Sequence, residues 1–215
     1  MKQIPSWLLN YAKHVVEKHD FDSSHDLIHF MNVYDYTQKI IDMDYDNGIS
    51  LIDTISREDS IKICLHAAFC HDLIDSKYVD SEKSLEELKY IFLSNEYDRE
   101  HLDIIVFLIN NMSFSKERFG KQHIPKKYQV AMNIISDADK LDAYRIERVI
   151  AYQERKNKDA QVNKKWIKTI LVKRILEYKD KWLKTNYAKS IAPPLHDNVQ
   201  KYVDEMLIDV EMVDY

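Results

Sequence analysis

Apolar side chains recur at three- and four-residue spacing along most of the chain, which is the pattern of amphipathic helices. In the first half, helices are predicted over the apolar stripe of residues 7–16, from about residue 26 to the turn at residue 46, and from about residue 57 to residue 72. Two more are predicted over residues 84–95, capped by Ser81 or Asp80, and over residues 101–112, capped by Asp98. No segment shows the alternation of apolar and polar positions that a half-buried strand requires. The chain is therefore expected to be all-α, a compact bundle of helices around one core.

The second half is less regular but still helical in pattern. A long helix is expected over residues 126–156, with a break near residues 137–142. An amphipathic helix over residues 166–182 would follow and would end by Pro193–Pro194, because proline cannot donate a backbone hydrogen bond. A last helix would carry Val199, Val203, Met206 and Leu207.

Composition narrows the class of protein. A net charge of −5 and a pI of about 6.0 give no basic footprint for a nucleic-acid polymer. No apolar run approaches the roughly 20 residues of a membrane span, and the N-terminus is not patterned as a signal peptide. A cytoplasmic protein without a membrane partner is the expectation. The only glycines, Gly48 and Gly120, are too few to build a glycine-rich loop that binds phosphate. The two cysteines, Cys64 and Cys70, are expected to be buried, reduced thiols.

Histidine and aspartate occur in three segments that are otherwise apolar. His29 lies near the start of a predicted helix, His71–Asp72 follows the apolar AAFC, and Asp139 lies in IISDADKLDAYRI. A buried carboxylate is costly unless it is paired or metal-bound, and aspartate is a poor residue in the middle of a helix. Each segment alone also fits a structural role, and a solvated face remains open for Asp137.

Taken together and in this order, SHDLIHFMNV, AAFCHDLIDSKY and SDADKLDA resemble the HD-domain superfamily of metal-dependent phosphohydrolases, especially its small stand-alone hydrolases. The resemblance covers about residues 7–155. It implies a bundle of HD-domain type over residues 1–155 with a metal site between helices, and a helical extension over residues 156–215 packed on the same domain. The implied ligands of one divalent ion (Mn, Fe, Co, Ni, Mg or Zn) are His29, His71, Asp72 and Asp139.

The same resemblance suggests roles for the neighbouring residues. Asp72, Asp75 and Lys77 are the expected catalytic residues, with Lys77 holding a phosphate oxygen and Asp75 orienting either the attacking water or Lys77. The expected substrate-binding residues are Lys77, His25, Asp26 and Lys140. Solvent exposure fits Lys140 equally well. The basic stretch 112–127 is expected to be a loop, either solvated or closing over phosphates.

Two features depart from the family pattern. Asn32 stands three residues after the first metal histidine, where such proteins commonly carry arginine. The stretch AYQERKNKDAQVNKKW contains no glycine, although many relatives are glycine-rich there. The pocket walls built by that stretch therefore do not follow from the resemblance.

The expected function is a metal-dependent phosphohydrolase that acts on a nucleotide or a similar small phosphorylated substrate, with metal-bound water attacking phosphorus. A non-catalytic metal- or nucleotide-binding sensor and a helical interaction scaffold are the alternatives. A two-metal HD phosphodiesterase or oxygenase is a lesser alternative, because its extra histidines would have to be His101 and His123, and neither looks well placed. A homodimer is left open.

Overall fold

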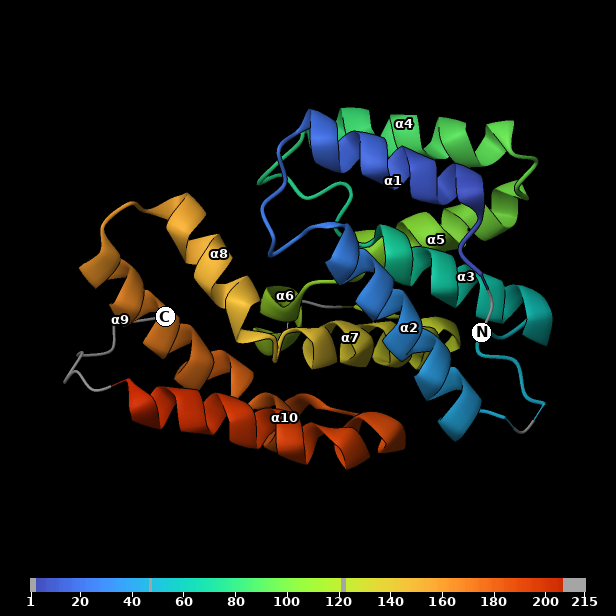
Figure 1. Cartoon of the computed structure of the whole chain (residues 1–215). Coiled ribbons are helices and arrows are strands. Elements are labelled where there is room, and N and C mark those ends of the chain that lie inside the picture. The colour runs from blue at the N-terminus through green and yellow to red at the C-terminus, as the bar shows by residue number, and fades with distance from the viewer. Residues whose placement is uncertain (1–2, 47, 121–122, 207–215) are drawn as a thin grey trace.

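The computed structural model describes residues 3–46, 48–120 and 123–206, and every regular element in these ranges is a helix (Figure 1). In chain order the elements are α1 (Ser6–Lys18), α2 (Leu27–Asp44), α3 (Arg57–Cys70), α4 (Ser81–Ser94), α5 (Arg99–Asn111), α6 (Phe114–Arg118), the 3₁₀ turn η1 (Lys126–Tyr128), α7 (Gln129–Asp142), α8 (Ile146–Lys156), α9 (Ala160–Ile170), the π-helical segments η2 (Leu171–Ile175) and η3 (Tyr178–Trp182), and α10 (Asn186–Glu205). The predicted all-α class is confirmed. Within the described ranges, none of the helices combines the length and the apolar character of a membrane span.

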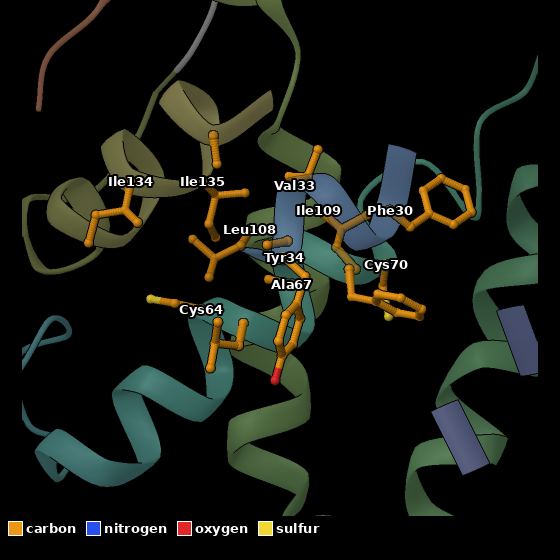
Figure 2. Packing of buried hydrophobic residues seen from close by; sticks show 14 of the residues in the cluster. Phe30, Val33, Tyr34, Cys64, Ala67, Cys70, Leu108, Ile109, Ile134 and Ile135 are labelled. Atoms are coloured by element: carbon orange, nitrogen blue, oxygen red, sulfur yellow. The ribbon is translucent and has the colours of Figure 1, made fainter. Parts of the chain in front are cut away.

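Helices α2, α3 and α7 pack against one another at the centre of the bundle, and α5 packs on α3. Helix α3 is buried on every face from Ile63 to Cys70, as expected for a helix that is apolar all round. Figure 2 shows its side chains meeting those of α2, α5 and α7. Cys64 and Cys70 are free and buried here, as predicted, and burial raises the pKa of both thiols.

The remaining helices lie on two sides of this centre. Helices α1 and α4 lie together on one side, and α8, α9 and α10 form the other (Figure 1). One continuous cluster of buried apolar residues extends from Leu8 to Val203. The C-terminal helices therefore share the core of the segment that carries the histidines and aspartates.

Local sequence explains several helix starts. The side chains of Asp26, Ser56, Asp80 and Asp98 each accept a hydrogen bond from the backbone amide three residues later. Such a cap stabilises a helix by about 1 kcal/mol. Of the two predicted candidates for the cap of α4, Asp80 rather than Ser81 takes this position, and the predicted cap at Asp98 is confirmed.

The prediction that residues 112–127 form a loop is partly wrong. This stretch contains α6 and the start of η1, while Lys121 lies outside the described residues. Ser113 caps α6, and Phe114 packs edge-on against Tyr178 and Trp182 with ring centroids 5.0 and 5.2 Å apart. These ring contacts join segments far apart in the chain, so local composition does not reveal them.

Two other boundaries also depend on packing. The long helix predicted over residues 126–156 breaks after Asp142 into α7 and α8, in line with the expected break. The predicted stop at Pro193–Pro194 is wrong, because both prolines lie inside α10 on its exposed side. The opposite side buries Ala188, Ala192, Val199 and Val203, and this packing offsets the missing amide donors. Of the residues predicted for the last helix, Leu207 lies outside the described ranges.

Asp137 is fully buried, so a solvated position for it is wrong. Its Oδ2 accepts hydrogen bonds from the backbone amides of Lys184 and Thr185, at 2.8 and 2.7 Å, and from the Thr185 hydroxyl at 2.9 Å. A carboxylate in the middle of α7 therefore holds the residues that begin α10.

Replacing Asp137 with alanine is expected to lower the free energy of unfolding by about 2–3 kcal/mol, because the buried amide of Thr185 and the partly buried amide of Lys184 lose their acceptor. Urea denaturation measures this difference. Asp103→Ala, on the exposed face of α5, is the matched control and should change stability by less than about 0.5 kcal/mol. Equal effects of the two substitutions would contradict the anchoring role of Asp137.

Candidate metal centre

Three central helices bring four potential ligands to one point. His29 lies in the first turn of α2, His71 and Asp72 follow the last residue of α3, and Asp139 lies near the end of α7. His29 Nε2 is 3.2 Å from His71 Nε2 and 3.3 Å from Asp72 Oδ2. His71 Nε2 is 3.1 Å from Asp72 Oδ2, and both imidazoles are 3.7 Å from Asp139 Oδ1.

These separations fit the edges of a coordination polyhedron. Metal–ligand bonds of about 2.1 Å place neighbouring ligand atoms about 3.0 Å apart in an octahedron and about 3.4 Å apart in a tetrahedron. Two imidazole nitrogens and two carboxylate oxygens form a mixed donor set that suits several divalent transition metals. The group His29, His71 and Asp139 has its ligand atoms within 4.8 Å of one another, as a common ion requires.

The far nitrogen of each imidazole is held in the way that metal-binding histidines usually are. His29 Nδ1 is 2.8 Å from Asp142 Oδ2, and His71 Nδ1 is 2.8 Å from the backbone oxygen of Ala68. Because both partners only accept hydrogen bonds, they hold a proton on Nδ1 and turn each Nε2 toward the cluster, as the atom that would bind an ion. Asp142 was not among the predicted site residues, although its position one turn after Asp139 is the signal that could have identified it.

The electrostatics of the cluster keep its carboxylates charged. Burial by itself raises the pKa of Asp72 and of Asp139, but the His71 imidazole outweighs it and holds both well below their usual range. Burial by itself lowers the pKa of His71, yet Asp72 and Asp139 raise it to about 10. The carboxylates of Asp72 and Asp139 therefore remain charged and can bind a cation.

Arg148 and Asn32 contact two carboxylates of the site, those of Asp139 and Asp142. Arg148 lies 3.2 Å from Asp142 Oδ2 and 3.8 Å from Asp139 Oδ1, and its Nε donates to the backbone oxygen of Ser24 at 2.7 Å. Asn32 Nδ2 donates to Asp142 Oδ1 at 2.7 Å. Asn32, which stands where arginine was expected, therefore binds the carboxylate that orients His29.

A second group of polar side chains adjoins the first. His25 Nε2 lies 3.5 Å from Asp72 Oδ2 and 3.9 Å from Asp75 Oδ2. Lys77 Nζ donates to Asp75 Oδ2 at 2.8 Å, so the two residues expected to act together are in contact. His25, Asp72 and Asp75 have the spacing of a metal-binding group, but the Lys77 ammonium already neutralises Asp75. His101 and His123 belong to neither group of the described residues.

Two predicted substrate-binding residues lie differently from expectation. Asp26 is the N-cap of α2, where its carboxylate accepts from the backbone amide of His29 at 3.0 Å, and it does not line the cavity described below. Lys140 is only 2% exposed, and its ammonium binds Glu117 at 2.8 Å. A solvent-exposed Lys140 is therefore wrong, and its ammonium is engaged within the cavity wall.

The cluster of His29, His71, Asp72 and Asp139 opens into a cavity of about 380 Å³. This volume lies in the range of roughly 300–1,000 Å³ that small-molecule sites occupy. His25, His71, Asp72, Asp75, Lys77, Asp139 and Arg148 form its polar end. Trp166, Ile170, Arg174 and Ile175 line it from α9 and η2, so residues beyond 155 help to build the site.

Comparison with known proteins finds solved structures with a similar fold. No protein-family profile matches the chain, and no curated protein matches it in sequence. A protein from Lactobacillus plantarum, solved by structural genomics, matches with a TM-score of 0.69 at 19% identity over 93% of each chain. Bacillus subtilis YpgQ matches with a TM-score of 0.63 at 19% identity, over 95% of this chain and 99% of that one. The Lin1889 protein of Listeria innocua matches with a TM-score of 0.61 at 19% identity, over 96% and 97%. At this level of identity the similarity shows a shared helical fold.

Proposed function

We propose that this protein is a metal-dependent phosphohydrolase that acts on a nucleotide or a similar small phosphorylated molecule. The observation that carries the proposal is the convergence of His29, His71, Asp72 and Asp139 at one end of a cavity. Helices from three parts of the chain fix these side chains before any ligand arrives, and such preorganisation is a requirement of efficient catalysis.

The four side chains would hold one divalent ion through two nitrogens and two or more oxygens. That ion supplies Lewis acidity, which neutralises charge on a phosphoryl group and lowers the pKa of water beside it. Asp142 and the Ala68 carbonyl keep the imidazoles oriented for this task.

The neighbouring residues can position the phosphoryl group and the attacking water. Lys77 places an ammonium in the same cavity, where it can bind a phosphoryl oxygen. The Asp75 carboxylate holds Lys77 in place, because it accepts hydrogen bonds from the Lys77 backbone amide at 3.0 Å and from the Lys77 ammonium at 2.8 Å. His25 faces the same space beside Asp72 and can form a hydrogen bond to water there.

The test is turnover by the purified protein with Mn²⁺, Mg²⁺, Co²⁺ or Ni²⁺. Nucleoside mono- and triphosphates, cyclic nucleotides and a generic phosphodiester form the substrate panel. Metal-dependent release of phosphate, of pyrophosphate or of an opened diester would support the proposal and identify the bond that is cleaved. Stoichiometric metal binding without any release would count against a hydrolase and favour a sensor.

Replacing Lys77 with alanine is expected to lower kcat/KM by about 10²-fold, because a cation beside the developing phosphoryl charge is lost. The free energy of unfolding should change by less than about 1 kcal/mol, since the side chain is 47% exposed and its ion pair is screened. Lys89→Ala, which removes a surface ion pair with Glu86, is the control for both measurements. A Lys77 variant that retains full activity, or that fails to fold, would refute the catalytic role.

A further inference from the structure

A second part of the cavity wall is built by elements that carry none of the four candidate ligands. It includes Tyr152 and Lys156 of α8, Trp166 and Ile170 of α9, and Arg174 and Ile175 of η2. None of these residues belongs to the three motifs that carry the metal ligands. The wall combines aromatic and aliphatic side chains with the cations of Lys156 and Arg174, whereas the polar end of the cavity carries the carboxylates and histidines.

A series of close contacts connects this wall with the polar end of the cavity. His25 lies beside Asp72, with Nε2 and Oδ2 3.5 Å apart, and its ring is 6.3 Å from the ring of Tyr152. Lys156 Nζ then lies 6.0 Å from the Tyr152 ring and 5.5 Å from the Trp166 ring. Trp166 and three of the candidate ligands thus line one cavity, so a small molecule with its phosphoryl group at the His/Asp cluster could also contact Trp166.

The π-helical segment η2 shapes the apolar part of this wall. The amide of Leu176 donates to the oxygen of Leu171 at 2.9 Å, a hydrogen bond that spans five residues rather than four. A wider turn of this kind brings residues five apart onto one face, and Ile170 and Ile175, which have that spacing, both line the cavity. Single π-helical turns are frequent at functional sites.

Positive charge runs along the same wall. The ring of Tyr152 has the Lys77 ammonium 5.4 Å from its centre and the Lys156 ammonium 6.0 Å from its centre. The two lysines thus flank an aromatic ring between the phosphoryl end and Trp166. This arrangement suits a ligand that is anionic at one end and planar at the other.

We infer that this wall is the binding site for the part of the substrate that carries no phosphate, and that this part is a planar aromatic ring of the nucleobase class. The ring would stack on the indole of Trp166 and contact Ile170 and Ile175. The inference rests on the proposed function and assigns a substrate-selecting role to residues 156–175. It also explains why an indole lines a cavity whose other end is charged.

Fluorescence tests the inference without turnover. Adenosine 5′-monophosphate and ribose 5-phosphate, which lacks the ring, are titrated separately into the metal-loaded protein with selective excitation of tryptophan. The nucleotide should quench emission in the wild type and in Trp7→Phe, because Trp7 packs against Phe92, with ring centroids 5.0 Å apart, away from the cavity. Quenching should be lost in Trp166→Phe, which retains a ring and therefore its packing.

Affinity provides the second readout. Trp166→Ala should raise the Kd of the nucleotide, and its KM where turnover occurs, by about 10- to 100-fold with little change in kcat. Its affinity for ribose 5-phosphate should remain that of the wild type, and this comparison distinguishes a lost stacking surface from a lost fold.

The outcomes separate this inference from the proposed function. Quenching that depends on Trp166, without any hydrolysis, would support the ring site and refute the hydrolase. Metal-dependent hydrolysis with an unchanged nucleotide KM in Trp166→Ala would support the hydrolase and overturn the ring site. Equal wild-type affinity for the nucleotide and for ribose 5-phosphate, or no nucleotide binding at all, would also overturn it.

Discussion

Replacing Asp139 with alanine is expected to lower metal-dependent turnover by at least about 10²–10³-fold, because the substitution removes one of the two carboxylates that face His29 and His71. The same variant should lose metal-dependent stabilisation. A ligand present at about 100 times its Kd stabilises the native state by about 2.7 kcal/mol, and chelation removes that contribution. Differential scanning fluorimetry with Mn²⁺ and with EDTA measures the effect in both proteins.

Two further variants sharpen this test. Asp139→Asn keeps the shape of the side chain and removes its charge, so it should behave like Asp139→Ala if coordination is the role of the carboxylate. Asp35→Ala, which removes an exposed ion pair with Lys39 on α2, should retain the full metal response. A wild-type melting temperature that neither EDTA nor Mn²⁺ changes would contradict the metal site. A scaffold protein would keep partner binding in all three variants.

Replacing Glu117 with alanine is expected to lower the free energy of unfolding by about 3–5 kcal/mol, which is the cost of leaving a buried charge unpaired. Lys140 is 2% exposed, and its ammonium binds Glu117 Oε2 at 2.8 Å and the Ser136 hydroxyl. Lys184 contacts the other carboxylate oxygen, so Glu117 joins α6 to α7 and to the residues before α10. Urea denaturation followed by circular dichroism measures the loss.

The pH dependence of that loss provides an internal check. Burial by itself raises the pKa of Glu117, but Lys140 and Lys184 outweigh it and lower the pKa. The pair therefore stabilises the fold above the unfolded-state pKa of about 4.3, and its contribution is lost as the pH falls through the lowered folded-state pKa. The stability difference between the wild type and Glu117→Ala should shrink in acid.

Two substitutions control for the chemistry. Glu86→Ala removes an exposed pair with Lys89 and should cost less than about 1 kcal/mol. The double variant Glu117→Leu with Lys140→Met replaces both charges by apolar groups and should recover much of the stability lost in Glu117→Ala. No recovery would mean that Glu117 stabilises the fold mainly through Lys184 rather than through Lys140.

The helical class, the first five helices and the four candidate ligands that meet in the His/Asp cluster could all be predicted from the sequence. Helix periodicity and caps such as Asp80 and Asp98 are local properties, because they depend on side chains and amides within one or two turns. The four candidate ligands could be named because histidine and aspartate in apolar segments, in the order His29, His71–Asp72 and Asp139, resemble a known pattern.

The surroundings of those candidate ligands could not be predicted, because they depend on tertiary contacts. Asp142 reaches His29 across 113 residues of sequence, and Arg148 reaches the Ser24 carbonyl across 124. Lys140 is buried because α6 brings Glu117 to it, and Pro193–Pro194 remain helical because the opposite face of α10 is covered. Each of these outcomes depends on ion pairs or apolar contacts between segments that are far apart in the sequence. The residue pattern of a single segment does not tell which other segments it will contact, so these interactions could not be predicted from it.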